Sequence, residues 1–587
     1  MTPAPPGLSV PMPVVDIDLA APGAFRRPGG RVRIGPSGRA LGLVRLHGRP
    51  LGMAEASGHG PGELWQALAD AALRDFPAAP AAPEAPGAGG LSAAASGQGA
   101  GGPSAAVTAP GPRSRSAVAP PPEISVIIAT RNRAAMLRDC LDSLLALAYP
   151  RFEVIVVDNA PADGSTEELI RREYGPLRDR DRDRDRDRDG VGAGDWAVAG
   201  DGDRAVARTG AGRKRRPVVR YLREPVPGLA RAHNRGLAAA RGPIAAFTDD
   251  DTLVDPGWLT ALAAPFLADA RTGCVTGLIV PAELDTEAQV ALERHGAFAK
   301  GYAPRTWSLC APPTDPLFPF TAGRFGSGAN MAFRTDLLRG LGGFDPATGA
   351  GTPAHGGDDL LSFFRVLARG HSLAYEPAAI VWHRHRRTPE ALEAQAFGYG
   401  AGFGAYLAGA LVHEPRMLPA LLRRLPGGVR YALARSRERA AGLDTGRGVG
   451  LDTGLDTGPG AGHGTGRGAE PGTGRGTGAG AGPAAGADAG AGSGAGSAAG
   501  AGAVAGAGTA TEVASSRIAR LELRGLLYGP FGYLRSRREE RRLRRGAGQG
   551  RSARAAPWPV GSDGRARVGR ADGVRAHPES RRRGGAR

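Results

Sequence analysis

The chain has 587 residues and a formal net charge of +18 at pH 7, and it contains 93 Gly and 49 Pro. Its length alone predicts three or four domains, but Gly and Pro are concentrated in stretches without apolar periodicity, which are typical of linkers. The charge does not predict a nucleic-acid partner, because the basic residues are nearly all Arg and much of the excess follows residue 516.

Residues 1–77 are predicted to form a small N-terminal αβ appendage. Residues 14–19 alternate apolar and acidic side chains as a strand does, and residues 41–46 form a second apolar run. A helix is expected from Gly62 to Leu73. The Ala/Pro/Gly-rich residues 78–121 are expected to be a disordered linker.

Residues 122–420 carry the strongest signal for a folded domain. Runs of β-branched and aliphatic residues at 124–128 and 154–157 are typical of strands buried on both faces, and helical periodicity follows each of them. The alternation resumes with strands at 218–221 and 244–247. It predicts a doubly wound, mostly parallel α/β sheet. The alternating Arg and Asp residues within 178–216 have no apolar face, so this segment is expected to be a solvated, disordered insertion.

The C-terminal third has little regular pattern. Residues 421–515 are a low-complexity region rich in Gly and Ala, and residues 547–587 are expected to be a disordered basic tail. Between them, residues 516–546 form an amphipathic, arginine-rich helical segment that Gly529-Pro530 is expected to divide in two. This segment fits two roles equally well: peripheral binding to an anionic membrane, or packing on the catalytic domain.

Three adjacent carboxylates, Asp249, Asp250 and Asp251, directly follow a buried strand. In doubly wound sheets ligands bind beyond the carboxyl ends of the strands, and carboxylates crowded there repel one another unless a cation is bound. Alternate residues of an extended segment point the same way, so Asp249 and Asp251 can face one ion while Asp250 faces away. Hard oxygen ligands predict Mg²⁺ or Mn²⁺. The alternative is an acidic turn that caps the next helix.

Two further groups are candidates for chemistry. Asp358-Asp359 precedes an apolar helical pattern, where N-capping is the simpler explanation. His383 and His385 alternate at the end of another apolar run, where they can supply a metal ligand or phosphate contacts.

Together these motifs resemble the inverting glycosyltransferase family 2, whose fold is called GT-A. The resemblance covers roughly residues 123–387 and depends on the order and spacing of several pieces. These pieces are residues 126–133, 156–159, 228–236, 247–251, 326–334, 342–345 and 357–359.

The resemblance implies a role for each matching position. Thr130, Arg131 and Arg133 would line the nucleotide pocket, with Asp158 at the base. The remaining expected nucleotide-sugar contacts are Asn234, Asp249 and Asp250. The expected metal ligands are Asp249, Asp251, His383 and His385. Asp359 would be the catalytic base, with Asp358 as the alternative, because the family often has Glu-Asp where this chain has Asp-Asp.

The implied reaction is a metal-dependent, inverting transfer of a sugar from a UDP- or dTDP-type nucleotide sugar to a hydroxyl group. The expected acceptor is a glycan or a lipid-linked compound in the synthesis of bacterial cell-surface polysaccharide, glycolipid or a related glycoconjugate. Two alternatives are a nucleotidyltransferase, which would favour a Gly-rich phosphate loop after the first strand, and an inactive scaffold at a membrane, which would predict loss of the acidic motifs. Neither is favoured, because residues 129–133 contain no Gly and both acidic motifs are present.

Three scattered Cys residues favour a reducing compartment, and Met1 to Ala20 lacks the pattern of a signal peptide. We therefore expect a cytoplasmic protein, with peripheral contact at the inner face of the plasma membrane.

Overall fold

The computed structural model describes residues 10–29, 32–33, 38–76, 120–174, 177–178, 196–198, 217–296, 298–424, 426–427 and 500–549. In the last of these ranges, side chains are described from residue 517 to residue 545. The predicted linker at 78–119 and most of the predicted low-complexity region and basic tail lie outside these residues. No helix in the described ranges combines the length and apolarity that a membrane span requires.

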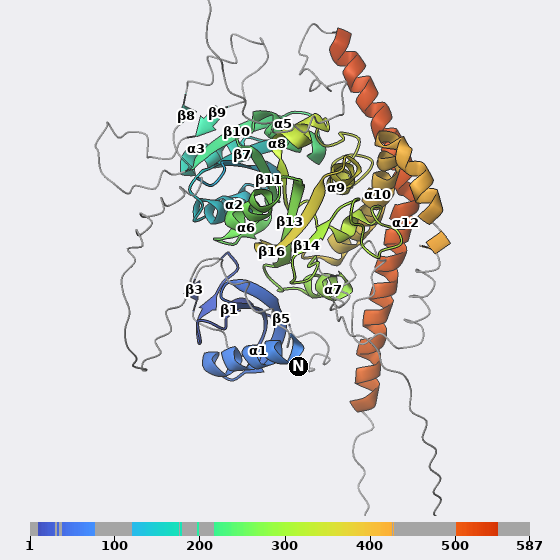
Figure 1. Cartoon of the computed structure of the whole chain (residues 1–587). Coiled ribbons are helices and arrows are strands. Elements are labelled where there is room, and N and C mark those ends of the chain that lie inside the picture. Colours follow the sequence, from blue (N-terminus) through green and yellow to red (C-terminus); the bar gives the residue numbers. More distant parts are fainter. Residues whose placement is uncertain are drawn as a thin grey trace, which may run out of the picture.

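The N-terminal unit is a five-stranded sheet with one helix packed on it, drawn in blue in Figure 1. The strands follow the order β3-β2-β1-β4-β5. Their bounds are β1 Val14–Asp18, β2 Phe25–Arg26, β3 Val32–Arg33, β4 Gly38–Leu46 and β5 Arg49–Gly58. The predicted helix is confirmed as α1, Pro61–Asp75, whose buried face includes Leu64, Trp65 and Leu68.

The second unit is built on an eleven-stranded mixed sheet in the order β12-β16-β13-β15-β11-β6-β7-β10-β9-β8, with β14 paired to β16. Its strands are β6 Ile124–Thr130, β7 Phe152–Asn159, β8 Leu177–Arg178, β9 Trp196–Val198, β10 Val218–Glu224, β11 Ile244–Asp249, β12 Thr252–Val254, β13 Thr272–Pro281, β14 Arg305–Trp307, β15 Asn330–Arg334 and β16 Ser372–His383. The longest ladders are parallel, and β10, β7, β6 and β11 form a continuous parallel centre. The predicted α/β class with a mostly parallel sheet is thus confirmed.

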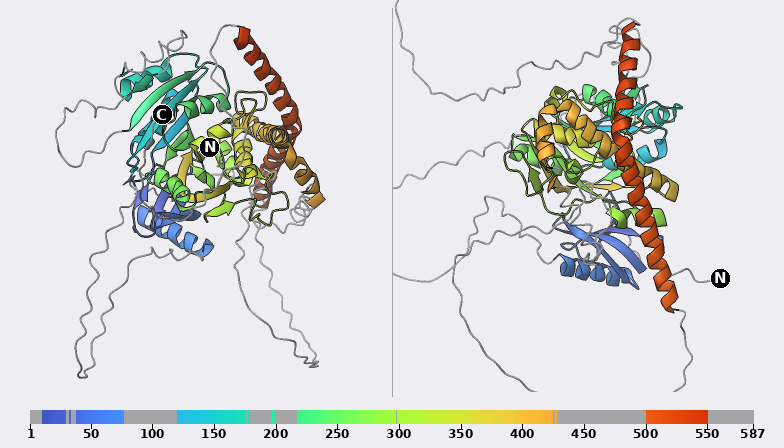
Figure 2. Two further views of the ribbon diagram at one scale, coloured as in Figure 1. Left: turned by 45° about the horizontal axis from the view of Figure 1, so that its top comes forward. Right: turned by 90° about the vertical axis from the view of Figure 1, so that its right-hand side faces the viewer.

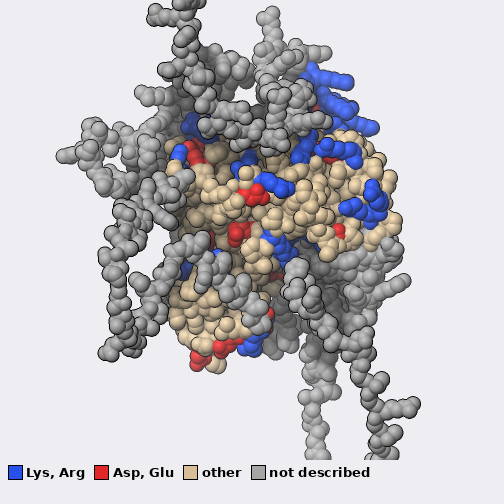
Figure 3. Space-filling model, viewed as in Figure 1, with Lys and Arg blue, Asp and Glu red and all other residues tan. Residues whose placement is uncertain are grey.

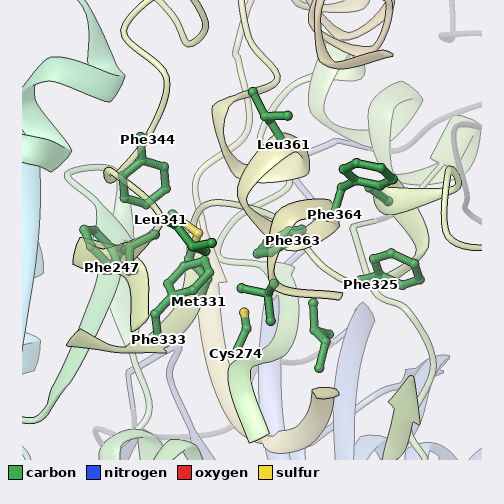
Figure 4. Close-up of a cluster of buried hydrophobic side chains, with 14 of the residues drawn as sticks. Phe247, Cys274, Phe325, Met331, Phe333, Leu341, Phe344, Leu361, Phe363 and Phe364 are labelled. Atoms are coloured by element: carbon green, nitrogen blue, oxygen red, sulfur yellow. The ribbon is translucent and has the colours of Figure 1, made fainter. Parts of the chain in front are cut away.

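Helices cover both faces of this sheet (Figure 1). They are α2 Ala134–Leu145, α3 Ser165–Glu173, α5 Leu229–Ala239, α6 Trp258–Ala268, α7 Glu287–Gly296, α8 Thr335–Gly340, α9 Asp358–Ala368 and α10 Pro389–His413, with short 3-10 turns at Ala322–Arg324 and Pro415–Met417. Because successive side chains of a strand point to opposite faces, Ile128 joins the hydrophobic cluster under α2 and α6, and Ile127 joins the cluster on the other face. Figure 4 shows part of this second cluster, where Phe247, Phe333 and Phe344 pack edge to face.

Within the predicted 178–216 insertion, the expectation of a wholly unstructured segment is wrong at two places. Arg178 ends β8, and residues 196–198 form β9, which pairs antiparallel with β10. Pairing with the free edge of β10 supplies backbone hydrogen bonds that the sequence pattern did not reveal. The repeating Arg-Asp residues between these strands lie outside the described part of the chain.

The C-terminal segment is one continuous helix, α12, Gly500–Gln549, so the predicted break at Gly529-Pro530 is wrong. It begins at Gly500 rather than at residue 516 and runs along α10 (Figure 2). At Gly404 and Gly529 a side chain would collide with the backbone of the opposite helix, so glycines set this close approach. An interior Pro costs a helix about 3 kcal/mol, and we attribute the continuity to packing on α10 before and after Pro530.

The N-terminal unit and the large sheet share one apolar cluster. Met12 forms an isolated bridge with Leu284, and Leu43 of β4 packs in the same cluster as Ile380 and Trp382 of β16. The first unit therefore lies against the strand that ends at His383.

Candidate active site

The Asp triplet spans the end of β11, at Asp249, and the turn to β12, which contains Asp250 and Asp251. β12 runs antiparallel to the end of β16, which places His383 opposite Thr252, one residue after the triplet. The capping alternative for the triplet is not what the structure shows, because α6 begins later and its N-cap residue is Gly257. The triplet instead occupies the carboxyl edge of the central parallel strands.

Asp249, Asp251 and His383 form a group in which each offers one ligand atom and all three atoms lie within 4.8 Å of one another. Asp250 is not part of this group, although Asp250 and Asp251 lie in a turn and not in the extended segment that the sequence argument assumed. Its carboxylate accepts hydrogen bonds from Thr130 Oγ1 at 2.7 Å and from Arg133 Nη1 at 3.1 Å. Two elements of the predicted nucleotide pocket, the ends of β6 and β11, are thereby joined.

The chemistry of this group fits a hard divalent cation. Asp251 Oδ1 is buried and has no hydrogen-bond partner among the described residues, and it lies 3.3 Å from His383 Nε2. The two carboxylates suit Mg²⁺ or Mn²⁺, and the imidazole nitrogen, a softer donor, favours Mn²⁺ of the two. The three residues can therefore hold the expected cation.

The carboxylates of this group differ in their electrostatic surroundings. Burial, and next the charge of Asp251, raise the pKa of Asp249 to about 7. Burial also opposes ionisation of Asp251, but His383, Arg386 and Arg133 outweigh it and hold the pKa of Asp251 below its usual value. Asp251 is thus the member that ionises more readily, and a bound cation would favour ionisation of Asp249 as well.

His385 lies behind His383 and is not one of the three grouped residues. Its Nδ1 is 3.3 Å from His383 Nδ1, and its Nε2 is 3.0 Å from Glu293 Oε2 on α7. Since the Glu293 carboxylate accepts, we assign the proton on His385 to Nε2, so that His385 Nδ1 accepts from His383 Nδ1–H. His383 then directs its Nε2 toward Asp251, and His385 and Glu293 orient it.

The acidic pair opens α9, where the N-cap residue is Gly357 and no side chain caps the helix. Asp358 is buried, whereas Asp359 is only half-buried. Asp359 Oδ2 accepts the backbone N–H of Gly328 at 2.8 Å, and Oδ1 accepts that of Leu360 at 2.8 Å. Burial, and next the charge of Asp358, raise the pKa of Asp359 to about 6. Asp359 is therefore more accessible than Asp358 and more basic than an ordinary surface aspartate.

Two connections bring the acidic pair to the Asp triplet. Thr248 Oγ1, next to the triplet, donates to Ala329 O at 2.9 Å, one residue from the Gly328 amide that binds Asp359. The second connection is His233 on α5. Its Nδ1 lies 3.5 Å from Asp358 Oδ2, and it lies close enough to Asp249 to influence the pKa of that carboxyl. Both acidic motifs thus belong to one site.

Sequence reasoning assigned no role to His233, Glu293 or Arg386. His233 is buried between the rings of Phe247 and Phe344, and its Nδ1 has no hydrogen-bond partner among the described residues. Arg386 Nη1 lies 3.6 Å from Asp251 Oδ2. The signal for His233 was its place within the matching motif at 228–236, but Glu293 had no signal because its segment matches no motif.

Three predicted contacts form no hydrogen bond with the Asp triplet or the acidic pair among the described residues. Asp158 is buried at the end of β7, where its Oδ2 accepts from Tyr221 Oη at 3.0 Å. Arg131 is exposed just after β6. Asn234 uses its side-chain amide on the backbone of Phe344, donating to the carbonyl and accepting from the N–H, each at 2.8 Å. These bonds favour a positioning role for Asn234, and its contact with a donor stays a prediction.

The sheet and its carboxylates define a class: an α/β protein whose residues beyond the carboxyl ends of parallel strands can hold a divalent cation. Comparison with known proteins makes the class specific. Residues 201–398 match the family model described as glycosyltransferase like family 2, and residues 125–189 match the model of glycosyl transferase family 2. The segment spanning these matches is a family 2 glycosyltransferase domain.

Named relatives match only part of the chain. Pre-mycofactocin glycosyltransferases of two Mycobacterium tuberculosis strains are each 30% identical over 159 residues, which is 27% of this chain and 30% of theirs. The putative glycosyltransferase EpsH of Bacillus subtilis is 24% identical over 137 residues, 23% of this chain and 28% of its own. The chain thus matches less than a third of the length of these curated relatives.

Among solved structures, a mannosyltransferase from Pyrobaculum calidifontis in complex with GDP-Man and Mn²⁺ is 21% identical. The likeness covers 55% of this chain and 81% of that one, with a TM-score of 0.32.

Proposed function

We propose that this protein is a metal-dependent, inverting glycosyltransferase that moves a sugar from a nucleotide-sugar donor to an acceptor hydroxyl. One observation carries the proposal: the ligand group of Asp249, Asp251 and His383 and the half-buried Asp359 lie in one connected site. The family 2 match of this segment supports the same reaction class.

The residues divide into a donor side and an acceptor side. On the donor side, Asp249, Asp251 and His383 would hold Mg²⁺ or Mn²⁺, which takes up the charge that develops on a nucleoside diphosphate leaving group. Thr130, Arg133 and Asp158 line the carboxyl ends of β6 and β7, where the nucleotide of a UDP- or dTDP-type donor would bind.

On the acceptor side, Asp359 is the proposed general base. An alcohol is a weak nucleophile until a positioned carboxylate accepts its proton as the attack proceeds. A base with a pKa of about 6 is ionised at neutral pH and still basic enough to accept that proton. With one base and no covalent nucleophile, a single displacement forms the new glycosidic bond, breaks the bond to the diphosphate and inverts the anomeric carbon. The acceptor would be a hydroxyl of a glycan or of a lipid-linked compound.

The first test is isothermal titration of the full chain with nucleoside diphosphates, with and without Mn²⁺. We expect binding that requires the metal, and at least tenfold weaker binding in Asp251→Asn. Asp336→Asn is the matched control, because the Asp336 side chain is 99% exposed and remote from the triplet. Equal binding without metal, or none at all, would count against the proposal.

A second measurement separates the alternatives. Incubating the protein with a panel of nucleotide sugars and Mn²⁺ should release a nucleoside diphosphate by slow donor hydrolysis. Release of pyrophosphate from a nucleoside triphosphate and a sugar phosphate would instead indicate a nucleotidyltransferase, and donor binding without any turnover an inactive scaffold.

A further inference from the structure

The helix α12 has two different faces. Its inner face packs on α10 through Gly525 and Gly529, and Tyr533 is fully buried. The outer face carries large apolar side chains that nothing in the described part of the chain covers. These are Leu523, Leu527, Phe531 and Leu534, with exposed fractions of 47%, 74%, 60% and 52%.

The four side chains form one stripe. Their spacing of four, four and three residues places them along one side of an α-helix, over about three turns. We call Leu523, Leu527, Phe531 and Leu534 the outer stripe. Four adjacent large apolar side chains on one helix face differ from scattered exposed apolar residues, which are normal on protein surfaces.

Arginines surround the outer stripe. Arg524 lies beside it, and Arg538, Arg541, Arg542 and Arg545 extend the same exposed side toward the C-terminal end of α12. None of these five forms an ion pair with a residue that the structure describes. In Figure 3 a patch of Lys and Arg side chains lies over the upper part of α12. The acidic side chain Glu540 faces away from it and pairs with Arg231 on α5.

We propose that the outer face of α12 docks the protein onto an anionic membrane surface. An apolar stripe bordered by arginines is the composition that inserts shallowly between lipid headgroups, with the cationic side chains against the lipid phosphates. A second copy of this chain is a poorer fit, because two such faces would bring their arginines together. The two roles predicted for this segment then occupy opposite faces of one helix. This inference goes beyond the proposed transfer reaction and does not depend on it.

The test is flotation of the full chain with vesicles of phosphatidylcholine alone or with phosphatidylglycerol. We expect binding to the anionic vesicles, weakened at high salt because exposed charges are screened. Leu527→Glu/Phe531→Glu should weaken that binding by roughly tenfold for each substituted side chain. Because both side chains are exposed, the thermal unfolding midpoint should be unchanged.

Leu267→Glu is the matched control, since Leu267 is 67% exposed on α6, outside the outer stripe. It should bind vesicles as the unaltered chain does. No flotation, equal flotation on neutral vesicles, or unchanged flotation of the double variant would overturn the proposal. A dimer that the double variant converts to a monomer, without lipid binding, would show that a second copy covers this face. Metal-dependent nucleotide binding by the double variant tests the proposed function separately.

Discussion

The same carboxylate side chain has different acid–base properties in different surroundings, as Asp249, Asp251 and Asp359 show. Salt-bridging and hydrogen-bonding partners keep Asp251 charged, whereas burial and a neighbouring carboxylate raise the pKa of Asp249 to about 7 and that of Asp359 to about 6. Of these three carboxylates, Asp359 alone accepts a backbone N–H group on each oxygen, and no arginine forms an ion pair with it in the part of the chain that the structure describes. It is therefore oriented but not neutralised, as a general base requires.

Replacing the proposed base should separate chemistry from donor binding. Asp359→Asn keeps the size of the side chain but removes the proton acceptor, so kcat should fall by roughly 10²- to 10⁴-fold. The dissociation constant for a nucleoside diphosphate with Mn²⁺ should change little, because the metal group lies on other elements. Measuring both in one preparation checks the expectation. Retained turnover would place the base elsewhere.

The pH dependence should follow Asp359. The base accepts a proton only when ionised, so kcat/KM at saturating Mn²⁺ should rise with pH through about 6 and level off above it. Asp358→Asn removes the neighbouring charge that helps to raise this pKa, so the acidic limb should move to lower pH. A limb that stays in place would contradict this account. Abolished turnover in Asp358→Asn would identify Asp358 as the base.

The sequence predicted the residues that strand periodicity or a motif defines, and missed those that only tertiary contacts define. The sequence grouped Asp249 with Asp251 by assuming an extended chain, and the structure groups them with His383, although Asp250 and Asp251 lie in a turn. Glu293 of α7 contacts His385 although the two residues are 92 positions apart in the chain, and no local sequence pattern predicts such a contact. The placement of His385 behind His383 depends on that same contact.

At the scale of elements, α12 shows where local rules are outweighed. Proline lacks a backbone N–H, so Pro530 predicted a break in the helix. The helix continues because the segments before and after Pro530 both pack on α10. The glycines that set the close approach looked like low-complexity composition in the sequence. Only their facing partners on α10 reveal that they are packing positions.

Helix α12 also contacts the segment that precedes Asp358-Asp359, through a hydrogen bond to Asp345. Tyr533 Oη donates to Asp345 Oδ2 at 2.8 Å, and His413 of α10 lies 2.7 Å from the same oxygen. Tyr533→Phe leaves a buried carboxylate with one partner fewer, and a hydrogen bond to a charged group contributes about 1.5–3 kcal/mol. We expect a loss of that order in the free energy of unfolding, with faster amide exchange at residues 345–357.

The control for Tyr533→Phe is Tyr528→Phe on the same helix. No described residue forms a hydrogen bond with the Tyr528 hydroxyl. The Tyr528 ring packs against His355 and Phe397, and Tyr528→Phe should keep these contacts. Urea unfolding should place Tyr528→Phe within a few tenths of a kcal/mol of the unaltered chain. Equal effects of the two variants would show that the bond to Asp345 contributes nothing specific.

At the scale of the whole molecule, the N-terminal unit is more than an attached appendage. Arg45 of β4 donates to both carboxylate oxygens of Asp16, at 2.7 and 2.8 Å, and its Nη2 reaches Asp255 Oδ2 at 2.7 Å. Asp255 follows β12, four residues after Asp251 of the metal group. The same unit packs on Trp382, the neighbour of His383 in β16. Two candidate metal ligands therefore sit on segments that the N-terminal unit holds in place.

Replacing Arg45, whose guanidinium joins Asp16 to Asp255, should destabilise the N-terminal unit and the large-sheet unit together. Arg45→Met keeps most of the side-chain volume but leaves Asp16 and Asp255 without their shared partner, which costs about 3–5 kcal/mol when a buried pair is broken. Arg39→Met is the matched control in the same strand, because the Arg39–Glu55 pair is more than a third exposed and contributes at most about 1 kcal/mol.

Two measurements check this expectation. Urea unfolding gives the free energy of unfolding of each variant, and titration with Mn²⁺ and a nucleoside diphosphate gives its affinity for the nucleotide. If β12 and β16 depend on the N-terminal unit, Arg45→Met weakens nucleotide binding under conditions in which it is still folded, and Arg39→Met does not. Unaltered binding by folded Arg45→Met would show that the two units are joined without any effect on the metal group.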